Sequence, residues 1–239
     1  MTLVLTSFVV LLASALQTAT GFGFSILAVP LLLMLHTPLV AVQLNLIVSV
    51  FLSILLIRTV RADVDTALIK RLMLASVAGV PFGLAILLYA DAKTFKFGTA
   101  ILMLVFMGLL LMKFSLSRTN SRDYICGWLA GLCTSAIGAG GLPLLLYFAG
   151  AGVQKAMARA TAVTFFLFVY GAALLLQTIV EPGSLFTWLF ATAQVPIAYA
   201  GVILGQWLYN RLSQKAFAYC IRIMLVANSV LLIIDAVYG

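Results

Sequence analysis

Two glycine clusters interrupt long apolar stretches of this 239-residue chain, Gly21-Phe22-Gly23 and Gly138-Ala139-Gly140-Gly141. Glycine has no Cβ atom, so the backbone at such positions can approach a ligand closely. A break between two helices also leaves N–H groups free at the start of the second helix, where the helix dipole is positive. This combination is suited to binding an anion.

Polar residues flank both clusters. Ser25 is a candidate N-cap for the helix after the first cluster, and Pro143 suits the first turn of the helix after the second. Gln17, Thr18, Thr134 and Ser135 precede the breaks. The candidate substrate-binding residues are Thr20, Gly21, Phe22, Gly23, Phe24, Ser25, Gln43, Asn45, Gly138, Ala139, Gly140, Gly141 and Arg159.

Several of these residues have a second interpretation. Gln43 and Asn45 are two residues apart and do not share one helix face, so either could instead form an interhelical hydrogen bond. Arg159 could attract anions, or it could be one of the basic residues of a cytoplasmic loop. The glycines could serve helix packing, which is the interpretation we favour for Gly79, Gly83, Gly201 and Gly205.

The composition defines the environment of these clusters. Hydrophobic residues make up 64% of the chain and charged residues 8%, with a mean hydropathy of +1.22. Soluble domains have roughly 45–50% apolar and about 25% charged residues. The chain is therefore predicted to be an integral membrane protein with roughly eight to ten helical segments, since one span needs about 20 residues. Spans rich in Leu, Ala and Val without alternation favour an all-α fold over a barrel.

Charged residues divide the chain into apolar runs. The charge-free runs are 1–57, 72–90, 97–112, 124–154, 160–180 and 182–210, and a last apolar run at 223–234 extends back through Phe217. If 124–154 crosses once, the 14 basic residues divide evenly between the two sides. If it returns as a hairpin, 12 of the 14 share one side, and only Lys93 and Lys96 lie opposite. The positive-inside rule favours the hairpin, which would turn at the second glycine cluster.

An internal repeat supports the hairpin. The cluster at Gly21 matches the cluster at Gly138 at an offset of 117 (138 − 21). A Gly-Val-x-x-Gly motif recurs at Gly79 and Gly201, at an offset of 122 (201 − 79). The chain is thus predicted to contain two repeats, 1–115 and 116–239, each a broken, re-entrant helical hairpin plus about three transmembrane helices.

An odd number of crossings in each repeat predicts that the second repeat is inverted relative to the first. Many secondary transporters have this arrangement, although a duplicated scaffold would show it too. Both termini are then expected on the non-cytoplasmic side of the cytoplasmic membrane, with no signal peptide removed. We interpret the net charge of +8 as an indication of how the protein is oriented in the membrane. It does not indicate nucleic-acid binding, because no basic stripe accompanies it.

The sequence gives little support to a catalytic or cofactor-binding function. The only histidine is His36, outside any metalloprotease motif, and the chain is not expected to be an enzyme or to hold a cofactor or metal. Three cysteines, Cys126, Cys133 and Cys220, are predicted to be buried thiols. All six carboxylates lie in predicted loops or near span ends, at Asp63, Asp65, Asp91, Asp123, Glu181 and Asp235. Transport would therefore be facilitated, or coupled to an ion held by backbone carbonyls.

The ordered set of motifs resembles the sulfite exporter TauE/SafE family over essentially the whole chain. The matching segments are Thr20-Gly21-Phe22-Gly23-Phe24 with Ala28-Val29-Pro30-Leu31-Leu32, Gly138-Ala139-Gly140-Gly141-Leu142-Pro143 with Tyr147, Arg159-Ala160-Thr161, and Gly79-Val80-Pro81-x-Gly83. The resemblance implies a prokaryotic cytoplasmic-membrane transporter for small sulfur-containing anions such as sulfite, thiosulfate or sulfonates. It also implies that Gly21, Gly23, Gly138, Gly140 and Gly141 approach the ligand.

One position departs from the family pattern. Leu142 stands where many members of the family have a second proline beside Pro143, so the start of that half-helix is left open. A membrane assembly or partner-binding subunit and a channel for a different small ion remain alternatives, and the oligomeric state is left open. The partners expected from the sequence are the small anion and the lipid bilayer.

Overall fold

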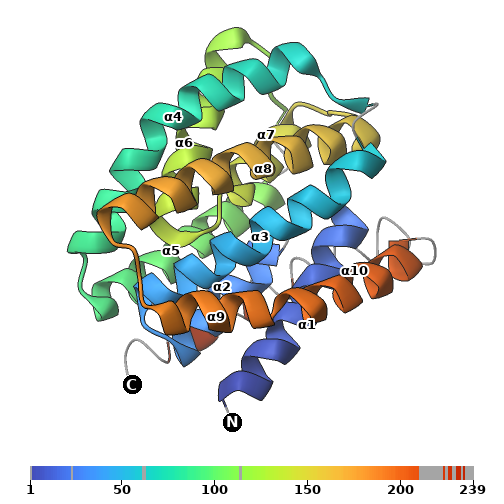
Figure 1. The fold of residues 1–239 in the computed structure, drawn as a ribbon. Helices are drawn as coiled ribbons and strands as arrows, with labels where there is room; N and C mark the ends of the chain where they lie inside the picture. The colour runs from blue at the N-terminus through green and yellow to red at the C-terminus, as the bar shows by residue number, and fades with distance from the viewer. Residues whose placement is uncertain are drawn as a thin grey trace.

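The structure, a computed structural model, describes residues 2–22, 24–60, 63–112 and 115–209, with isolated positions between 223 and 234. All regular structure in this part of the chain is helical, which confirms the all-α prediction (Figure 1). The helices are α1 (Thr2–Thr20), α2 (Phe24–Leu35), α3 (Pro38–Val60), α4 (Thr66–Tyr89), α5 (Ala92–Leu111), α6 (Asn120–Ile137), α7 (Gly141–Gly150), α8 (Lys155–Val180), α9 (Leu185–Ala193) and α10 (Val195–Tyr209).

Among the described residues, six helical stretches are long and apolar enough to cross a bilayer. They are α1, α3, α4, α5, α8, and α9 with α10 taken together as Leu185–Leu208. The helices α2 and α7 are apolar but have only 12 and 10 residues, too few to span about 30 Å of hydrocarbon. The protein is therefore a multi-pass membrane protein. The predicted last span and Cys220 lie mainly or wholly outside the described residues.

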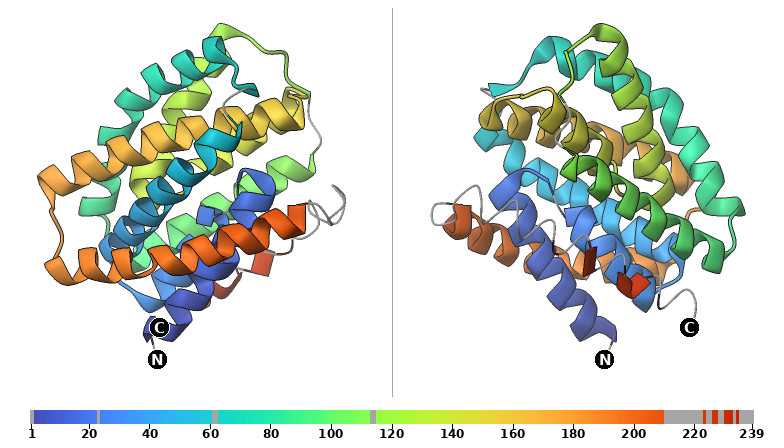
Figure 2. Two further views of the ribbon diagram at one scale, coloured as in Figure 1. Left: turned by 45° about the vertical axis from the view of Figure 1, so that its right-hand side comes forward. Right: turned by 180° about the vertical axis from the view of Figure 1, so that it is seen from behind.

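The chain turns back on itself at both glycine clusters. The Thr6 hydroxyl on α1 lies 3.0 Å from Nε2 of His36, which follows α2 directly. In the second half, the hydroxyl of Tyr147 on α7 donates to the carboxylate of Asp123 on α6. Each short helix therefore runs back along its long partner, as expected for a broken hairpin. Figure 2 shows the two helix pairs from two further sides.

A left-handed glycine ends the long helix of each hairpin. Gly21 has φ +81°, and Gly138, which caps α6, has φ +71°. Behind Gly138, the N–H of Ala139 donates to the carbonyl of Cys133 at 3.1 Å, a bond typical of glycine-terminated helices. The glycine clusters predicted as helix breaks are thus confirmed as helix ends.

Glycines bring α4 and α6 into close contact, and these two helices share the most extensive packing in the described structure. A Cβ atom on Gly79 would lie 2.1 Å from the carbonyl oxygen of Trp128, and one on Gly83 would lie 2.2 Å from that of Leu132. Only glycine allows the two backbones to approach so closely. The packing role favoured for these glycines in the sequence is the one the structure shows.

The second half provides the matching contact between α10 and α1. A Cβ atom on Gly201 would lie 2.6 Å from the carbonyl oxygen of Leu11, and one on Gly205 would lie 2.4 Å from that of Ala15. These two carbonyls precede those contacted on α6 by the same 117 residues that separate the two glycine clusters. The long hairpin helix of each half therefore packs against a glycine face from the other half.

We expect Gly79→Ala to lower the thermal stability of the detergent-solubilised protein, by about 1–3 kcal/mol, because the added methyl group pushes α4 away from α6. The matched control is Gly98→Ala on α5, where an added Cβ atom meets nothing within 4 Å. The measurement is the thermal melting of the two variants, monitored by size-exclusion chromatography. An equal loss of stability in both variants would contradict the packing role.

The helices α3 and α8 run side by side through the middle of the molecule (Figure 1). They are antiparallel: Gln43 near the start of α3 donates to the carbonyl of Pro182 beyond the end of α8, while the N–H of Asp65 beyond α3 donates to Thr161 near the start of α8. About 67% of the most apolar part of α3 is buried inside the protein. This central pair is the support on which both breaks lie.

Candidate functional site

The two breaks contact each other through Phe22. Its ring lies 5.9 Å from that of Phe166 on α8 and 6.1 Å from that of Phe148 on α7, edge to face in both cases. A Cβ atom built on Gly141, at the start of α7, would lie 4.0 Å from the Phe22 ring. Segments separated by more than a hundred residues in sequence are thereby brought together against α8.

The first break rests on the beginning of α8. A Cβ atom on Gly21 would lie 2.6 Å from Cγ and 3.1 Å from Cα of Arg159. The left-handed φ of Gly21 and this close approach both require glycine. Arg159 is half-buried at this contact. The structure therefore brings together Gly21 and Arg159, both of which the sequence predicts as substrate-binding residues.

The second break is held by Asn45 of α3. The Asn45 side-chain amide donates to the carbonyl of Gly138 at 2.9 Å and to the hydroxyl of Ser25 at 3.3 Å. The Ser25 hydroxyl in turn lies 3.0 Å from the hydroxyl of Tyr170 on α8. One buried amide therefore connects the end of α6 with the start of α2.

The predicted capping role of Ser25 is wrong. Helix α2 begins at Phe24, so Ser25 is already inside its first turn. Its hydroxyl is used between helices, by Asn45 and Tyr170, and not at the end of its own helix. Pro143, by contrast, lies in the first turn of α7 as expected.

Several buried polar atoms without a hydrogen-bond partner lie on the helices that form or hold the breaks. They include Nε2 of Gln17, Oδ1 of Asn45, Oγ of Ser49 and Oγ of Ser135, and both amide atoms of Gln177 near the far end of α8 are unpaired as well. Each of these residues is at most 2% exposed. Gln17 lies four residues before Gly21 and Ser135 three residues before Gly138. An unsatisfied buried polar group costs about 1–3 kcal/mol, and the atoms of Gln17, Asn45 and Ser135 beside the breaks are ones that a polar ligand or water would satisfy.

Other residues predicted for the site have different partners. Gln43 donates to the carbonyl of Pro182 at 3.3 Å and lies against Gly183, at the far end of α8 from Arg159. It therefore makes the structural hydrogen bond that was the alternative interpretation of its sequence position. The hydroxyls of Thr18 and Thr134 bond to carbonyls of their own helices.

The remaining predicted residues lie at or beside the breaks. Phe24 and Ala139 are fully buried. A Cβ atom on Gly140 would lie against its own hairpin partner helix, at the carbonyl of Ala130. Gly23 and the side chain of Thr20 lie outside the described residues.

Sequence reasoning missed Tyr170 as part of this region. Its hydroxyl lies 3.0 Å from that of Ser25 and its ring stacks on Phe166 at 5.2 Å. The available signal was its polar group, since a buried tyrosine hydroxyl in an apolar helix normally has a partner. Which partner it has depends on the arrangement of the helices.

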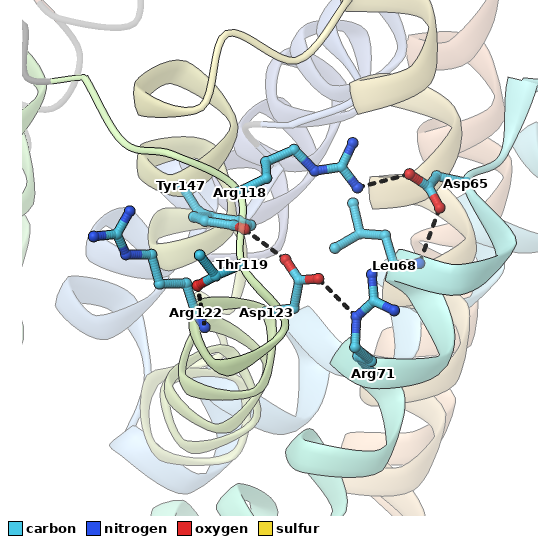
Figure 3. Close-up of polar contacts among 8 residues, drawn as sticks. All are labelled: Asp65, Leu68, Arg71, Arg118, Thr119, Arg122, Asp123 and Tyr147. Atoms are coloured by element: carbon cyan, nitrogen blue, oxygen red, sulfur yellow. Dashed lines mark hydrogen bonds and ion pairs between the residues drawn. The ribbon is translucent and has the colours of Figure 1, made fainter.

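A second polar cluster lies at the other end of the α6–α7 hairpin (Figure 3). Arg71 of α4 pairs with Asp123 of α6 at 2.7 Å, and Asp123 also accepts a hydrogen bond from Tyr147. Asp123 is in the first turn of α6, near a span end as predicted, but it is only 1% exposed. Its burial was not predicted, because sequence position alone does not show what packs over a helix end.

The neighbouring pair joins Arg118 to Asp65, the N-cap of α4, at 2.7 Å. The pKa of Asp65 is lowered, chiefly by the hydrogen bond from the backbone N–H of Leu68 and further by Arg118. A carboxylate whose pKa is lowered by folding stabilises the protein above its unfolded pKa. That contribution is lost as the pH falls through the folded value.

We therefore expect the stability difference between wild type and Asp65→Asn to be largest at neutral pH and to vanish as the pH falls below about 4. Asparagine is also a good N-cap, so the difference reports mainly the partly exposed Arg118 pair and should be at most about 1 kcal/mol. Melting temperatures measured from pH 7 down to pH 3 provide the test. A difference that does not depend on pH would contradict this assignment.

Comparison with known proteins gives one match. The family model described as sulfite exporter TauE/SafE matches residues 6–232, which include both helix breaks and the two helices, α3 and α8, on which they lie. No curated protein and no solved structure matches the chain significantly.

Proposed function

Because this chain belongs to the sulfite exporter TauE/SafE family, we propose that it moves a small sulfur-containing anion across the cytoplasmic membrane, bound between the two helix breaks. Sulfite, thiosulfate and sulfonates form the substrate class. The observation that carries this proposal is the meeting of the two breaks against α3 and α8, with unpaired buried polar atoms around them.

The electrostatics of the breaks support an anion. Helix α7 begins at Gly141 next to the N-cap Gly140, and no side chain caps it. The N–H of Leu142 donates to the carbonyl of Ala139 at 3.2 Å and Pro143 has no N–H, so α7 offers a ligand the N–H of Gly141 and the positive end of its dipole. The side-chain amide of Gln17, an unpaired donor, lies one turn before the other break. The half-buried Arg159 adds a positive charge beside Gly21.

We further propose that the two halves, 1–115 and 116–239, are inverted repeats that rock against each other to expose the site alternately. The reciprocal contacts support this: α4 packs on α6 as α10 packs on α1, and each break lies on a helix of the other half. The distribution of basic residues supports an orientation with both termini outside the cytoplasm.

The mechanism that best agrees with the buried residues is facilitated movement without proton coupling. The buried carboxylate Asp123 is engaged by Arg71 and Tyr147 at the end of α6 and does not face the breaks. A membrane potential of 100 mV would drive a monoanion outward with about 2.3 kcal/mol.

The direct test is flux into proteoliposomes under an imposed potential at equal pH on both sides. Sulfite, thiosulfate, sulfoacetate, taurine and sulfate should be compared, with protein-free liposomes as the control. Potential-driven flux of one or more anions is expected. Flux that appears only with a pH gradient would exclude the uncoupled mechanism, and transport of a cation alone, or of nothing, would overturn the proposal.

Asn45→Ala is expected to weaken anion binding about tenfold, equivalent to about 1.4 kcal/mol, because the carbonyl of Gly138 and the start of α2 lose their shared donor. Gln43→Ala on the same helix is the matched control, since it removes an amide that bonds to the Pro182 carbonyl instead. Isothermal titration of both variants with the transported anion is the measurement. Equal losses in the two variants would argue against a site at the breaks.

A further inference from the structure

A pocket of about 200 Å³ lies between α5, α6 and α7. Its lining is almost entirely apolar. The lining residues are Phe106, Leu116, Arg122, Ile125, Cys126, Leu129, Pro143, Leu146 and Tyr147. The pocket is smaller than the roughly 300–1,000 Å³ of a typical small-molecule site, so it holds an elongated apolar group better than a compact solute.

The pocket opens toward lipid. Two of its lining residues on α6, Ile125 and Leu129, are large apolar side chains that are 58% and 36% exposed on the outer surface of the helix. Its inner residues Phe106 and Cys126 are 8% and 5% exposed. In a membrane protein, exposed apolar side chains on a helix within the bilayer contact lipid tails. With α6 placed in the bilayer as half of the proposed re-entrant hairpin, the pocket would face the hydrocarbon of the membrane.

A positive charge without a carboxylate partner stands at the edge of the pocket. Nη1 of Arg122 donates to the carbonyl and the hydroxyl of Ser117, both at 2.7 Å. The arginines Arg71 and Arg118 nearby are each paired with an aspartate, whereas Arg122 forms no ion pair with the described part of the chain. Figure 3 shows its guanidinium directed away from Asp123.

We propose that this pocket binds an acyl chain of an anionic phospholipid, whose phosphate pairs with Arg122. The apolar pocket is complementary to the acyl chain of such a lipid and the Arg122 guanidinium to its phosphate, whereas a small hydrophilic anion would leave the apolar pocket unfilled. Arginine is well suited to phosphate because its planar donors bind two oxygens at once. Basic pockets between helices on the cytoplasmic side bind anionic head groups in the same way.

The lipid would contact the second break indirectly. Pro143, Leu146 and Tyr147 of the pocket wall belong to α7, the half-helix that begins at that break. The thiol of Cys126, also in the wall, contacts the carbonyl of Pro143 at 3.8 Å. A lipid in the pocket therefore packs directly on α7 and should stabilise the folded α6–α7 hairpin, because a ligand that binds only the native state raises its melting temperature.

The test is the melting temperature of the full-length purified protein in detergent, titrated with dioleoylphosphatidylglycerol or, in parallel, with dioleoylphosphatidylcholine. The anionic lipid is expected to raise the melting temperature and the zwitterionic lipid is not. Arg122→Gln should abolish the difference. Arg58→Gln is the control, since it removes an exposed basic residue in the last turn of α3 that does not line this pocket.

A second variant tests the apolar half of the site with Arg122 intact. Leu146→Trp fills the pocket from its half-exposed wall and should also abolish the shift. Equal shifts with both lipids, or a full shift in Arg122→Gln or Leu146→Trp, would overturn the proposal. So would an equal shift with inorganic phosphate alone, which would indicate a free-anion site. The readout is independent of transport, so it stands even if the proposed substrate is incorrect.

Discussion

Gly138→Ala is expected to reduce anion transport to the level of protein-free liposomes. Gly138 has φ +71°, a conformation that costs an alanine about 1–2 kcal/mol. Its added Cβ atom would also lie 2.6 Å from Nδ2 of Asn45 and 3.4 Å from Cγ2 of Val29. The methyl group therefore displaces the amide that holds both breaks in place, and the proposed site loses its geometry.

The control for this prediction is Gly152→Ala in the loop between α7 and α8. Gly152 has a similar φ of +61°, but an added Cβ atom there meets nothing within 4 Å. It should therefore cost a similar 1–2 kcal/mol of stability while leaving transport intact. Flux measured at equal amounts of folded protein separates the two effects. Comparable flux in both variants would show that the break at Gly138 does not form the site.

Asp123→Ala is expected to destabilise the protein by about 3 kcal/mol. The Asp123 carboxylate is 1% exposed and joins three helices, through Arg71 of α4 and Tyr147 of α7. Removing one partner of a buried ion pair costs about 3–5 kcal/mol, because the other charge is left unpaired. The lower end applies here, since the Arg71 side chain is 23% exposed and can regain some water.

For a protein of this size, that loss corresponds to a melting temperature lower by about 6–12 °C. Glu181→Gln is the control, because this exposed carboxylate after α8 makes no ion pair with the residues that the structure describes. Asp123→Asn adds a distinction: the amide oxygen still accepts from Tyr147, but its NH₂ group faces the guanidinium. We expect an intermediate loss. A melting temperature unchanged in Asp123→Ala would mean that the pair contributes nothing to the fold.

Helix positions followed directly from the sequence. In a bilayer, backbone groups must be satisfied within the helix, and charged side chains are costly, so apolar length and charge placement define the spans. The breaks at Gly21 and Gly138 could also be predicted from the sequence. A left-handed backbone conformation favours glycine, so a glycine cluster within an apolar run indicates a helix end. The packing of Gly79 followed from the same small-residue logic, although only the structure identified the carbonyl of Trp128 as its contact.

Side-chain partners were decided by tertiary structure. Gln43 and Asn45 are equivalent by residue type and helix, yet one bonds to the loop at Pro182 and the other to Gly138. The difference arises from a rotation of about 200° between positions two apart on a helix. Which neighbour each side then faces depends on how α3 packs.

The sequence by itself therefore determined the membrane class, the spans within the described residues and the two chain reversals of this protein, because solvent and backbone sterics act on each residue locally. Only the tertiary structure determined that the breaks meet at Phe22, that Ser25 bonds to Tyr170 and that Asp123 is buried beneath Arg71. These features depend on the relative positions of helices far apart in the chain. The local sequence does not determine these relative positions directly.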